Sequence, residues 1–142
     1  MNDIINPILS VRNLTIHYIT DNGVVKAVND ISFDLAKGET MGLVGETGAG
    51  KTTTALGIMN LIPNPPGKII SGEILVDGKN ILGLNIREIR KYRGNVASMI
   101  FQDPMTALNP ILTVGEQIAE VSRLHDKLSK ADSYIKAAEM LE

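Results

Sequence analysis

The pattern of apolar and polar residues in the first quarter of the chain is typical of β-strands. Apolar positions alternate in part with polar ones, and turn signals bound the runs. The predicted strands are residues 8–18, 24–28 and 31–35. Arg12 and Asn13 interrupt the first run, so that one long strand or two short ones are both open. We expect about residues 1–39 to form an antiparallel β region.

The next part of the chain predicts a strand, a loop and a helix. Residues 40–44 are short and mostly apolar, as in a buried parallel strand, and residues 52–59 begin an apolar helix. Prolines follow in residues 63–67 and cannot continue that helix, because proline lacks the N–H. We therefore expect the helix to end near Leu61. The strand, the loop and the helix together should span about residues 40–62.

Strands and a short helix are predicted over about residues 69–101. Residues 72–81 suggest a strand, an Asp-Gly turn and a return strand. Residues 85–93 suggest a solvated helix with Ile86 and Ile89 on one side and the basic residues outward. Residues 97–103 form an apolar strand pattern that ends in polar residues.

Helical periodicity begins after a loop with two prolines and marks about residues 102–142 as a separate segment. Thr113 and Glu116 have the spacing of a capping box, and a second helix is predicted from near Ser129. On the first helix, one face holds Val114, Ile118, Val121 and Leu124. On the second, the residues expected inward are Ile135, Ala138 and Leu141.

Composition narrows the function classes. The 142 residues are 44% hydrophobic with a net charge of −2, which favours a globular chain and excludes a broad basic face for nucleic acid. There is no cysteine, so disulfides and thiolate metal sites are excluded, in keeping with a reducing cytoplasm. No apolar run approaches the roughly 20 residues that span a bilayer. Membrane association is expected only through a partner.

Residues 45–52 match the P-loop pattern of Gly, four residues, and Gly-Lys-Thr. In such loops glycines let backbone N–H groups curl around phosphates, lysine reaches the terminal phosphates, and a hydroxyl holds Mg²⁺. The predicted strand before the loop and helix after it supply the expected context. The candidate residues are Gly45, Glu46, Thr47, Gly48, Ala49, Gly50, Lys51 and Thr52.

Other polar residues have less specific patterns. Tyr18 ends a predicted strand, where its ring could stack on an adenine or simply lie partly buried. His17 and His125 have no second ligand at metal spacing, so both are interpreted as structural or solvent-facing. Asp77 follows an apolar strand but precedes a glycine, which favours a turn over a Mg²⁺ site.

Taken together, these motifs resemble the N-terminal part of the ATP-binding subunit of an ABC transporter, specifically the dipeptide/oligopeptide and nickel importer group. The matches are the Walker A loop at residues 45–52, Tyr18 in the place of the A-loop aromatic, and residues 101–110 as the Q-loop region. The last is the most discriminating. The implied fold class is α/β, a P-loop NTPase core with an antiparallel β subdomain and the start of a helical subdomain.

The resemblance implies the cofactors ATP and Mg²⁺ and assigns their contacts. Lys51 and the loop backbone would hold the β- and γ-phosphates, and Thr53 would add a phosphate contact. Thr52 and Gln102 would reach Mg²⁺, and Tyr18 would stack on adenine.

The same resemblance implies partners and a location. These are transmembrane permease subunits and a second ATP-binding subunit in a head-to-tail dimer, with the protein on the cytoplasmic, inner face of the membrane. Residues 103–110 would sense or transmit closure. The transported substrate, dipeptide, oligopeptide or nickel, stays open, as does the oligomeric state of this chain.

The chain departs from the family in its catalytic elements. It contains no Leu-Ser-Gly-Gly-Gln signature, no Walker B strand ending in Asp-Glu and no D-loop. Asp77 and Asp103 do not replace these elements, and His125 lies too early in the chain to be the switch histidine. We expect ATP binding without efficient hydrolysis. Whether 142 residues is a natural length or a fragment is open. Alternatives are a P-loop ATPase or kinase not linked to transport, and a truncated nucleotide-dependent interaction module.

Overall fold

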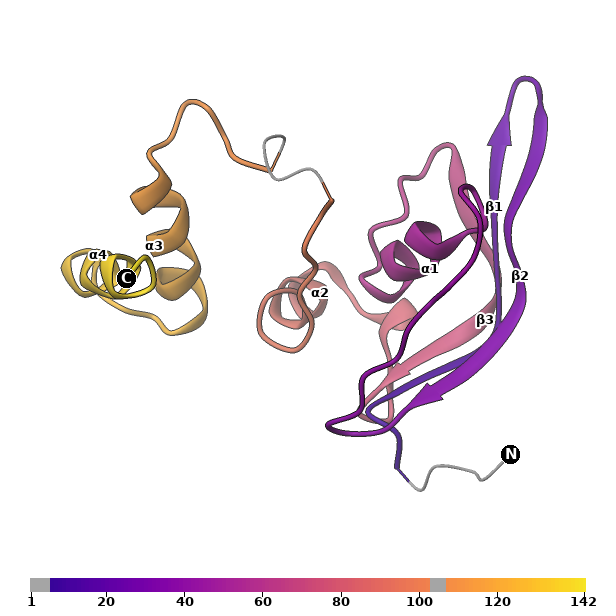
Figure 1. The fold of residues 1–142 in the computed structure, drawn as a ribbon, viewed down its shortest axis with the longest axis horizontal. Coiled ribbons are helices and arrows are strands. Elements are labelled where there is room, and N and C mark those ends of the chain that lie inside the picture. Colours follow the sequence, from indigo (N-terminus) through magenta and orange to yellow (C-terminus); the bar gives the residue numbers. More distant parts are fainter. Residues whose placement is uncertain (1–5, 103–106) are drawn as a thin grey trace. The chain divides into compact units, whose positions relative to one another are not determined.

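The computed structural model describes residues 6–102 and 107–142, which divide into two compact units, Met1–Ile89 and Arg90–Glu142. The fold is mixed α/β, as predicted. In the first unit, a four-stranded antiparallel sheet of order β2-β1-β3-β4 carries a helix on one face (Figure 1). The elements are β1 (Leu9–Thr20), β2 (Gly23–Leu35), α1 (Lys51–Ile58), β3 (Gly67–Val76), β4 (Lys79–Asn80), a 3-10 turn η1 (Ile81–Gly83), α2 (Ile86–Tyr92), α3 (Val114–His125) and α4 (Lys130–Glu139).

Side-chain hydrogen bonds keep β1 and β2 continuous where the sequence pattern breaks. Asn13 and Asp30 have positive φ angles of 46° and 48°, and Asn13 Nδ2 donates to Asp30 Oδ1 at 2.8 Å. Asn13 N also donates to the Ser32 hydroxyl at 2.8 Å. The polar interruption is thus an irregularity within one long strand, and the two strands predicted over residues 24–35 are a single strand.

The core of the first unit lies between α1 and one face of the sheet. Leu14, Ile16 and Ile74 are fully buried there. A Cβ atom at Gly57 of α1 would lie 3.0 Å from Ile16 Cδ1 and 3.8 Å from Ile74 Cδ1. Because glycine brings the helix backbone this close, α1 and the loop before it are held against the sheet.

α1 ends at Ile58, before the predicted end near Leu61, because Asn60 terminates it. Asn60 has a φ of 51°, and its N–H bonds the Gly57 carbonyl at 2.8 Å while Leu61 N–H bonds the Leu56 carbonyl at 2.7 Å. This pattern is a Schellman motif with asparagine in the left-handed position. The helix therefore ends before the first proline that follows it, Pro63, and the prolines are not what ends it.

The predicted turn at Asp77 and Gly78 is confirmed. Both residues have positive φ, 49° and 74°, as a two-residue hairpin turn requires, and β4 returns antiparallel to β3. β3 begins at Gly67, five residues before the predicted start, because β1 pairs with it as far as Tyr18.

Two predicted strands are wrong. Residues 40–44 and 98–102 are irregular, and among the described residues neither segment pairs with a neighbouring strand. Val44 is 95% exposed and Ile100 is 97% exposed. A parallel strand is stabilised by neighbours that bond both of its edges, so an apolar run alone does not form one.

The predicted pairing of Ile86 with Ile89 on one side of α2 is also wrong. Ile86 is 70% exposed, whereas Ile89 and Tyr92 are buried. The spacing of three residues between Ile89 and Tyr92 sets the buried side of this short helix.

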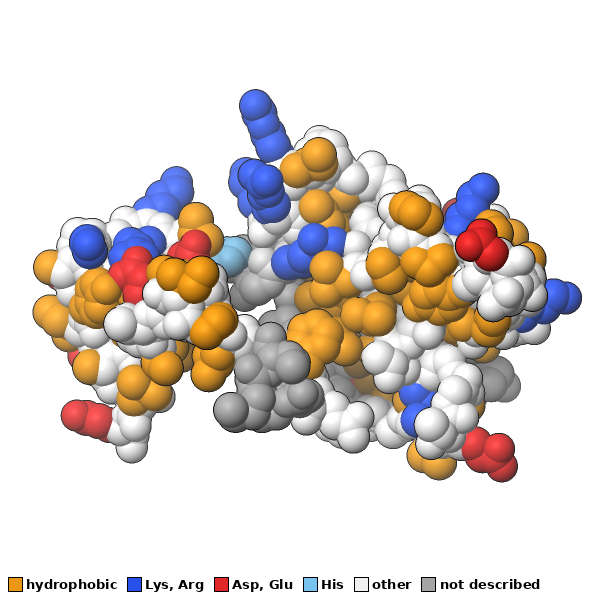
Figure 2. All heavy atoms as spheres, turned by 90° about the horizontal axis from the view of Figure 1, so that it is seen from above, with side chains coloured by type: hydrophobic (Ala, Val, Ile, Leu, Met, Phe, Trp, Pro, Cys, Tyr) orange, Lys and Arg blue, Asp and Glu red, His pale blue; other side chains and the backbone are white. Residues whose placement is uncertain are grey.

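Small residues mediate the packing of α3 against α4 in the second unit. Ala119 and Ser122 of α3 and Ser133 and Ala137 of α4 are buried. The larger residues on the two predicted faces are exposed except Ile118, which is half-buried, so apolar side chains reach the surface of this hairpin (Figure 2). The exposed ones are Ile135 at 60% and Leu141 at 65% on α4's side, and Val114, Val121 and Leu124 on α3. Ala138 is exposed as well. Small side chains allow the two helix backbones to approach closely, which outweighs the apolar pattern.

The predicted N-cap at Thr113 is present, and a second hydroxyl, that of Ser129, caps α4. The Thr113 hydroxyl accepts from Glu116 N, and the Ser129 hydroxyl accepts from Asp132 N. The Glu116 side chain bonds Arg123 and the Tyr134 hydroxyl, and so links α3 to α4. Arg123, and then Tyr134, lower the pKa of Glu116, while the bond to Glu116 raises the pKa of Tyr134.

These shifts predict a pH window for the α3–α4 hairpin. The lowered pKa of Glu116 means that its stabilisation is present above its usual value of 4.5 and is lost as the pH falls through the folded value. The raised pKa of Tyr134 means that its stabilisation is present below its usual value of 10.0 and is lost as the pH rises through the folded value.

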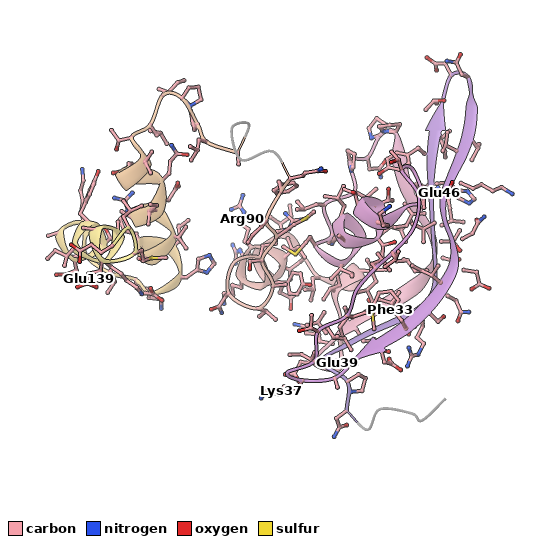
Figure 3. The ribbon with its side chains drawn as sticks, viewed as in Figure 1. Phe33, Lys37, Glu39, Glu46, Arg90 and Glu139 are labelled. Carbon is pink, nitrogen blue, oxygen red and sulfur yellow. The ribbon has the colours of Figure 1, made fainter. Side chains whose placement is uncertain are left out.

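We expect Glu116→Gln to flatten the acid loss of helicity, measured by circular dichroism during titration from neutral pH to about pH 3. Glu139→Gln, at the end of α4 (Figure 3), is the matched control and should keep the wild-type profile. Identical profiles for wild type and Glu116→Gln would contradict the assignment.

Candidate phosphate-binding site

The loop of residues 45–50 leads directly into α1. Gly48 and Gly50 have φ angles of 84° and 80°, the left-handed region that side-chain-bearing residues rarely adopt. Gly50 is the N-cap of α1, so no side chain caps the first N–H groups of the helix, and its first turn holds no acidic residue. The positive end of the helix dipole therefore stays available to an anion.

Lys51 folds back over the loop that precedes it. Its Nζ donates to the Gly45 and Glu46 carbonyls, each at 2.6 Å, and Ala49 N donates to the Glu46 carbonyl at 3.1 Å. An ammonium group with three donors is thus centred above the loop. The structure brings together Lys51 and the predicted loop residues 45–50.

A close contact with β2 fixes the far end of the loop. Register between β1 and β2 shifts at Ala27, and the Ala27 carbonyl lies 2.1 Å from the position a Cβ atom would take at Gly50. The Gly50 carbonyl in turn accepts from Thr54 N at 2.8 Å and from the Thr54 hydroxyl at 2.9 Å. The loop is therefore anchored to both the sheet and the helix.

A cavity of about 370 Å³ lies between β2 and the loop. Its lining includes Gly48, Ala49 and Lys51 on the loop side and Lys26 and Ala27 on the strand side. Lys26 is a second cation beside the candidate site that sequence reasoning missed. Lys26 lies one residue before Ala27, which contacts Gly50, and its place there follows from the register shift and from no signal in the sequence.

Tyr18 lies in β1 opposite Gly67 of β3 and Val25 of β2. Its ring is partly buried, with Cε1 3.0 Å from the position a Cβ atom would take at Gly67. Tyr18 and the phosphate loop belong to the same unit. Stacking on a base stays a prediction.

The predicted Mg²⁺ ligands belong to different units. Thr52 and Thr53 lie in the first turn of α1, with Thr52 exposed, whereas Gln102 belongs to the second unit. Their pairing around a metal stays a prediction. Asp103 and the predicted closure residues 104–106 lie outside the described residues.

The described end of the Q-loop region is tied to α3 by Gln117, which sequence reasoning missed. Gln117 Oε1 accepts from Asn109 N at 2.9 Å, and its Nε2 donates to the carbonyls of Asn109 and Leu112, both at 3.1 Å. These three bonds make the segment before Thr113 and the first turn of α3 a single piece.

Two negative findings apply to the described residues. Over residues 6–102 and 107–142, no cluster of three or more His, Asp or Glu side chains could hold a metal ion, and His17 and His125 do not meet such partners. None of the helices in that part of the chain combines the length and apolarity that a membrane crossing demands.

Comparison with known proteins places this loop in a family. The family model described as ABC transporter matches residues 28–142. A probable peptide ABC transporter ATP-binding protein, y4tR, from Sinorhizobium fredii is 45% identical over 94% of this chain and 40% of its own length. The oligopeptide transport ATP-binding protein OppD from Bacillus subtilis is 47% identical over 95% of this chain and 38% of its own. The chain thus spans about 40% of the length of these relatives.

A solved structure agrees on the fold. A dimeric structure of the ATP-binding cassette MJ0796 in a post-hydrolysis state, bound to ADP and Pi, aligns with a TM-score of 0.76 at 23% identity. The alignment covers 92% of this chain and 54% of that one.

The anchoring contact predicts that the two left-handed glycines are not equivalent. We expect Gly50→Ala to lower the free energy of unfolding by more than about 2 kcal/mol, because the new methyl group meets the Ala27 carbonyl in addition to the backbone strain. Gly48→Ala is the matched control, since a Cβ there meets nothing within 4 Å, and should cost about 1 kcal/mol from strain alone. Equal losses in urea unfolding would contradict the contact.

Proposed function

Because the chain belongs to the ABC transporter family, we propose that it is the nucleotide-binding part of a peptide importer's ATP-binding subunit and that it binds ATP·Mg²⁺ at residues 45–53. Support comes from relatives named as oligopeptide and dipeptide transport ATP-binding proteins, at 42–50% identity over most of this chain.

The observation that carries the proposal is the arrangement of Lys51 over the loop. Its ammonium group is held by two carbonyl oxygens, Gly45 O and Glu46 O, at a helix N-terminus without a side-chain cap. Neutral carbonyl oxygens are weaker partners for an ammonium group than phosphate oxygens, because a phosphate adds the attraction between opposite charges to the hydrogen bond. Residues of this kind fit a nucleotide triphosphate.

The chain's own residues would divide the work as follows. Lys51, now on the two carbonyls, would neutralise the terminal phosphates, and the backbone N–H groups of residues 48–53 would bond their oxygens. The Thr52 hydroxyl, with Gln102 from the second unit, would hold Mg²⁺, and Tyr18 would cover one face of adenine. ATP supplies the phosphoanhydride bond whose cleavage drives transport.

Hydrolysis needs further groups. These 142 residues contain no apolar strand that ends in Asp-Glu and no signature loop, and Asp77, which follows β3, lies in the hairpin turn. Positioning of water and stabilisation of transition-state charge are therefore incomplete. We propose that this stretch binds nucleotide without efficient turnover.

The proposal extends to partners and place. We propose a head-to-tail pair with a second ATP-binding subunit and assembly with transmembrane permease subunits. A structure of similar fold is dimeric, and a relative is named as an ABC transporter protein, which supports both only in general terms. The protein would then lie at the cytoplasmic face of the membrane. The stretch tied by Gln117 to α3 would transmit movement from the nucleotide to the permease.

The test is a calorimetric titration of the full chain with ATP·Mg²⁺. We expect saturable binding near one site per chain that falls at least about tenfold in Lys51→Ala, because an ammonium group facing phosphate contributes roughly 1.5–3 kcal/mol. Lys37→Ala is the charge-matched control, since Lys37 lies at the other end of the segment that leads to Glu46 (Figure 3). It should bind as the wild type does.

Equal affinities for wild type and Lys51→Ala would contradict the proposed site. Robust ATP turnover by the chain, abolished in Lys51→Ala, would contradict the proposal of binding without hydrolysis but keep the site.

A further inference from the structure

Gly67 is crowded by three groups that meet at one point. A Cβ atom there would lie 2.6 Å from Ile62 Cγ2, 2.9 Å from the Pro63 carbonyl oxygen and 3.0 Å from Tyr18 Cε1. Gly67 is buried, and it is the residue of β3 that pairs with Tyr18. Any side chain at this position would displace the tyrosine ring, the isoleucine or the backbone.

The backbone around Gly67 is fixed by hydrogen bonds. Gly67 N donates to the Pro63 carbonyl at 2.7 Å, and Ile19 N donates to the Pro66 carbonyl at 2.8 Å. The first bond closes the loop between α1 and β3, and the second ties that loop to β1 just after Tyr18. The surface beneath the ring therefore has little freedom to move away.

Directly paired residues of an antiparallel sheet project to the same face, so the ring of Tyr18 lies across Gly67. An aromatic ring that covers a glycine on the neighbouring strand is a known device for holding both in place. The Ile62 methyl group borders the same point. Ile62 Cγ2 and Tyr18 Cε1 thus both border the space above Gly67, which limits how the ring can turn.

We propose that Gly67, supported by Ile62, is a positioning residue that holds the Tyr18 ring ready to stack on a purine base. This inference rests on the proposed function, because it takes ATP as the ligand. A ring that is already oriented loses little conformational entropy when a base binds. Gly67 would contact Tyr18 and not the ligand, so its effect on the ligand would pass through the ring.

The consequence is that changes at Gly67 should affect binding of the base but not binding of the phosphates. A substitution at Gly67 should weaken the binding of ligands that carry adenine and leave the binding of phosphate-only ligands unchanged. Lys51 and residues 45–50 are held separately, by Ala27 and Thr54. A merely structural role of Gly67 would weaken both.

The experiment titrates the full chain with ATP·Mg²⁺ and, separately, with Mg²⁺ and inorganic tripolyphosphate. We expect Gly67→Ala to weaken ATP about tenfold, a loss within the range for base–aromatic stacking, and to change the affinity for tripolyphosphate less than about twofold. Gly83→Ala is the matched control, because a Cβ there meets nothing within 4 Å, and should bind both ligands as the wild type does.

A double-mutant cycle tests whether the effect passes through the ring. On a Tyr18→Ala background, Gly67→Ala should cause no further loss of ATP affinity. Ile62→Ala, which opens space instead of filling it, should also weaken ATP binding without weakening tripolyphosphate binding. If circular dichroism shows that Gly67→Ala does not fold, the Ile62→Ala result decides the question.

Equal weakening of ATP and tripolyphosphate, or additive losses in the cycle, would overturn the role of Gly67. Those results leave the proposed function intact. Failure of the wild-type chain to bind either ligand in a Lys51-dependent manner would instead remove the proposed function, and this inference with it.

Discussion

The approach of Gly50 to the Ala27 carbonyl is the constraint on which the site depends. Strand β2 gains one residue relative to β1 at this point, and the displaced carbonyl occupies the space that any side chain at position 50 would need. The same glycine begins α1 and bonds Thr54 twice through its carbonyl. Sheet, loop and helix therefore meet at Gly50. Because Lys51 follows Gly50 directly, this position also orients Lys51 over the loop.

Local chemistry made part of this structure predictable. The P-loop, the Asp77-Gly78 turn and the hydroxyl caps at Thr113 and Ser129 all depend on residues within a few positions of one another. Features that depend on distant partners were not predictable. Residues 40–44 look like a strand but lack a ladder among the described residues, and the importance of Gly67 appears only when Tyr18 and Ile62 meet over it. The prolines predict a helix end near Leu61, whereas Asn60 ends α1 earlier through its left-handed φ.

The resting position of Lys51 bears on affinity. Binding a phosphate exchanges two bonds to carbonyl oxygens for bonds to phosphate oxygens, so only the difference contributes to the free energy of binding. This exchange favours weak or transient binding. A pre-oriented Tyr18 ring offsets part of its cost on the adenine side.

The most direct test is a crystal structure of the chain with ATP·Mg²⁺. The account predicts that the backbone of residues 45–50 keeps its path and that Lys51 Nζ leaves the Gly45 and Glu46 carbonyls to lie within about 3 Å of phosphate oxygens. A nucleotide bound elsewhere, with Lys51 still on the two carbonyls, would contradict it.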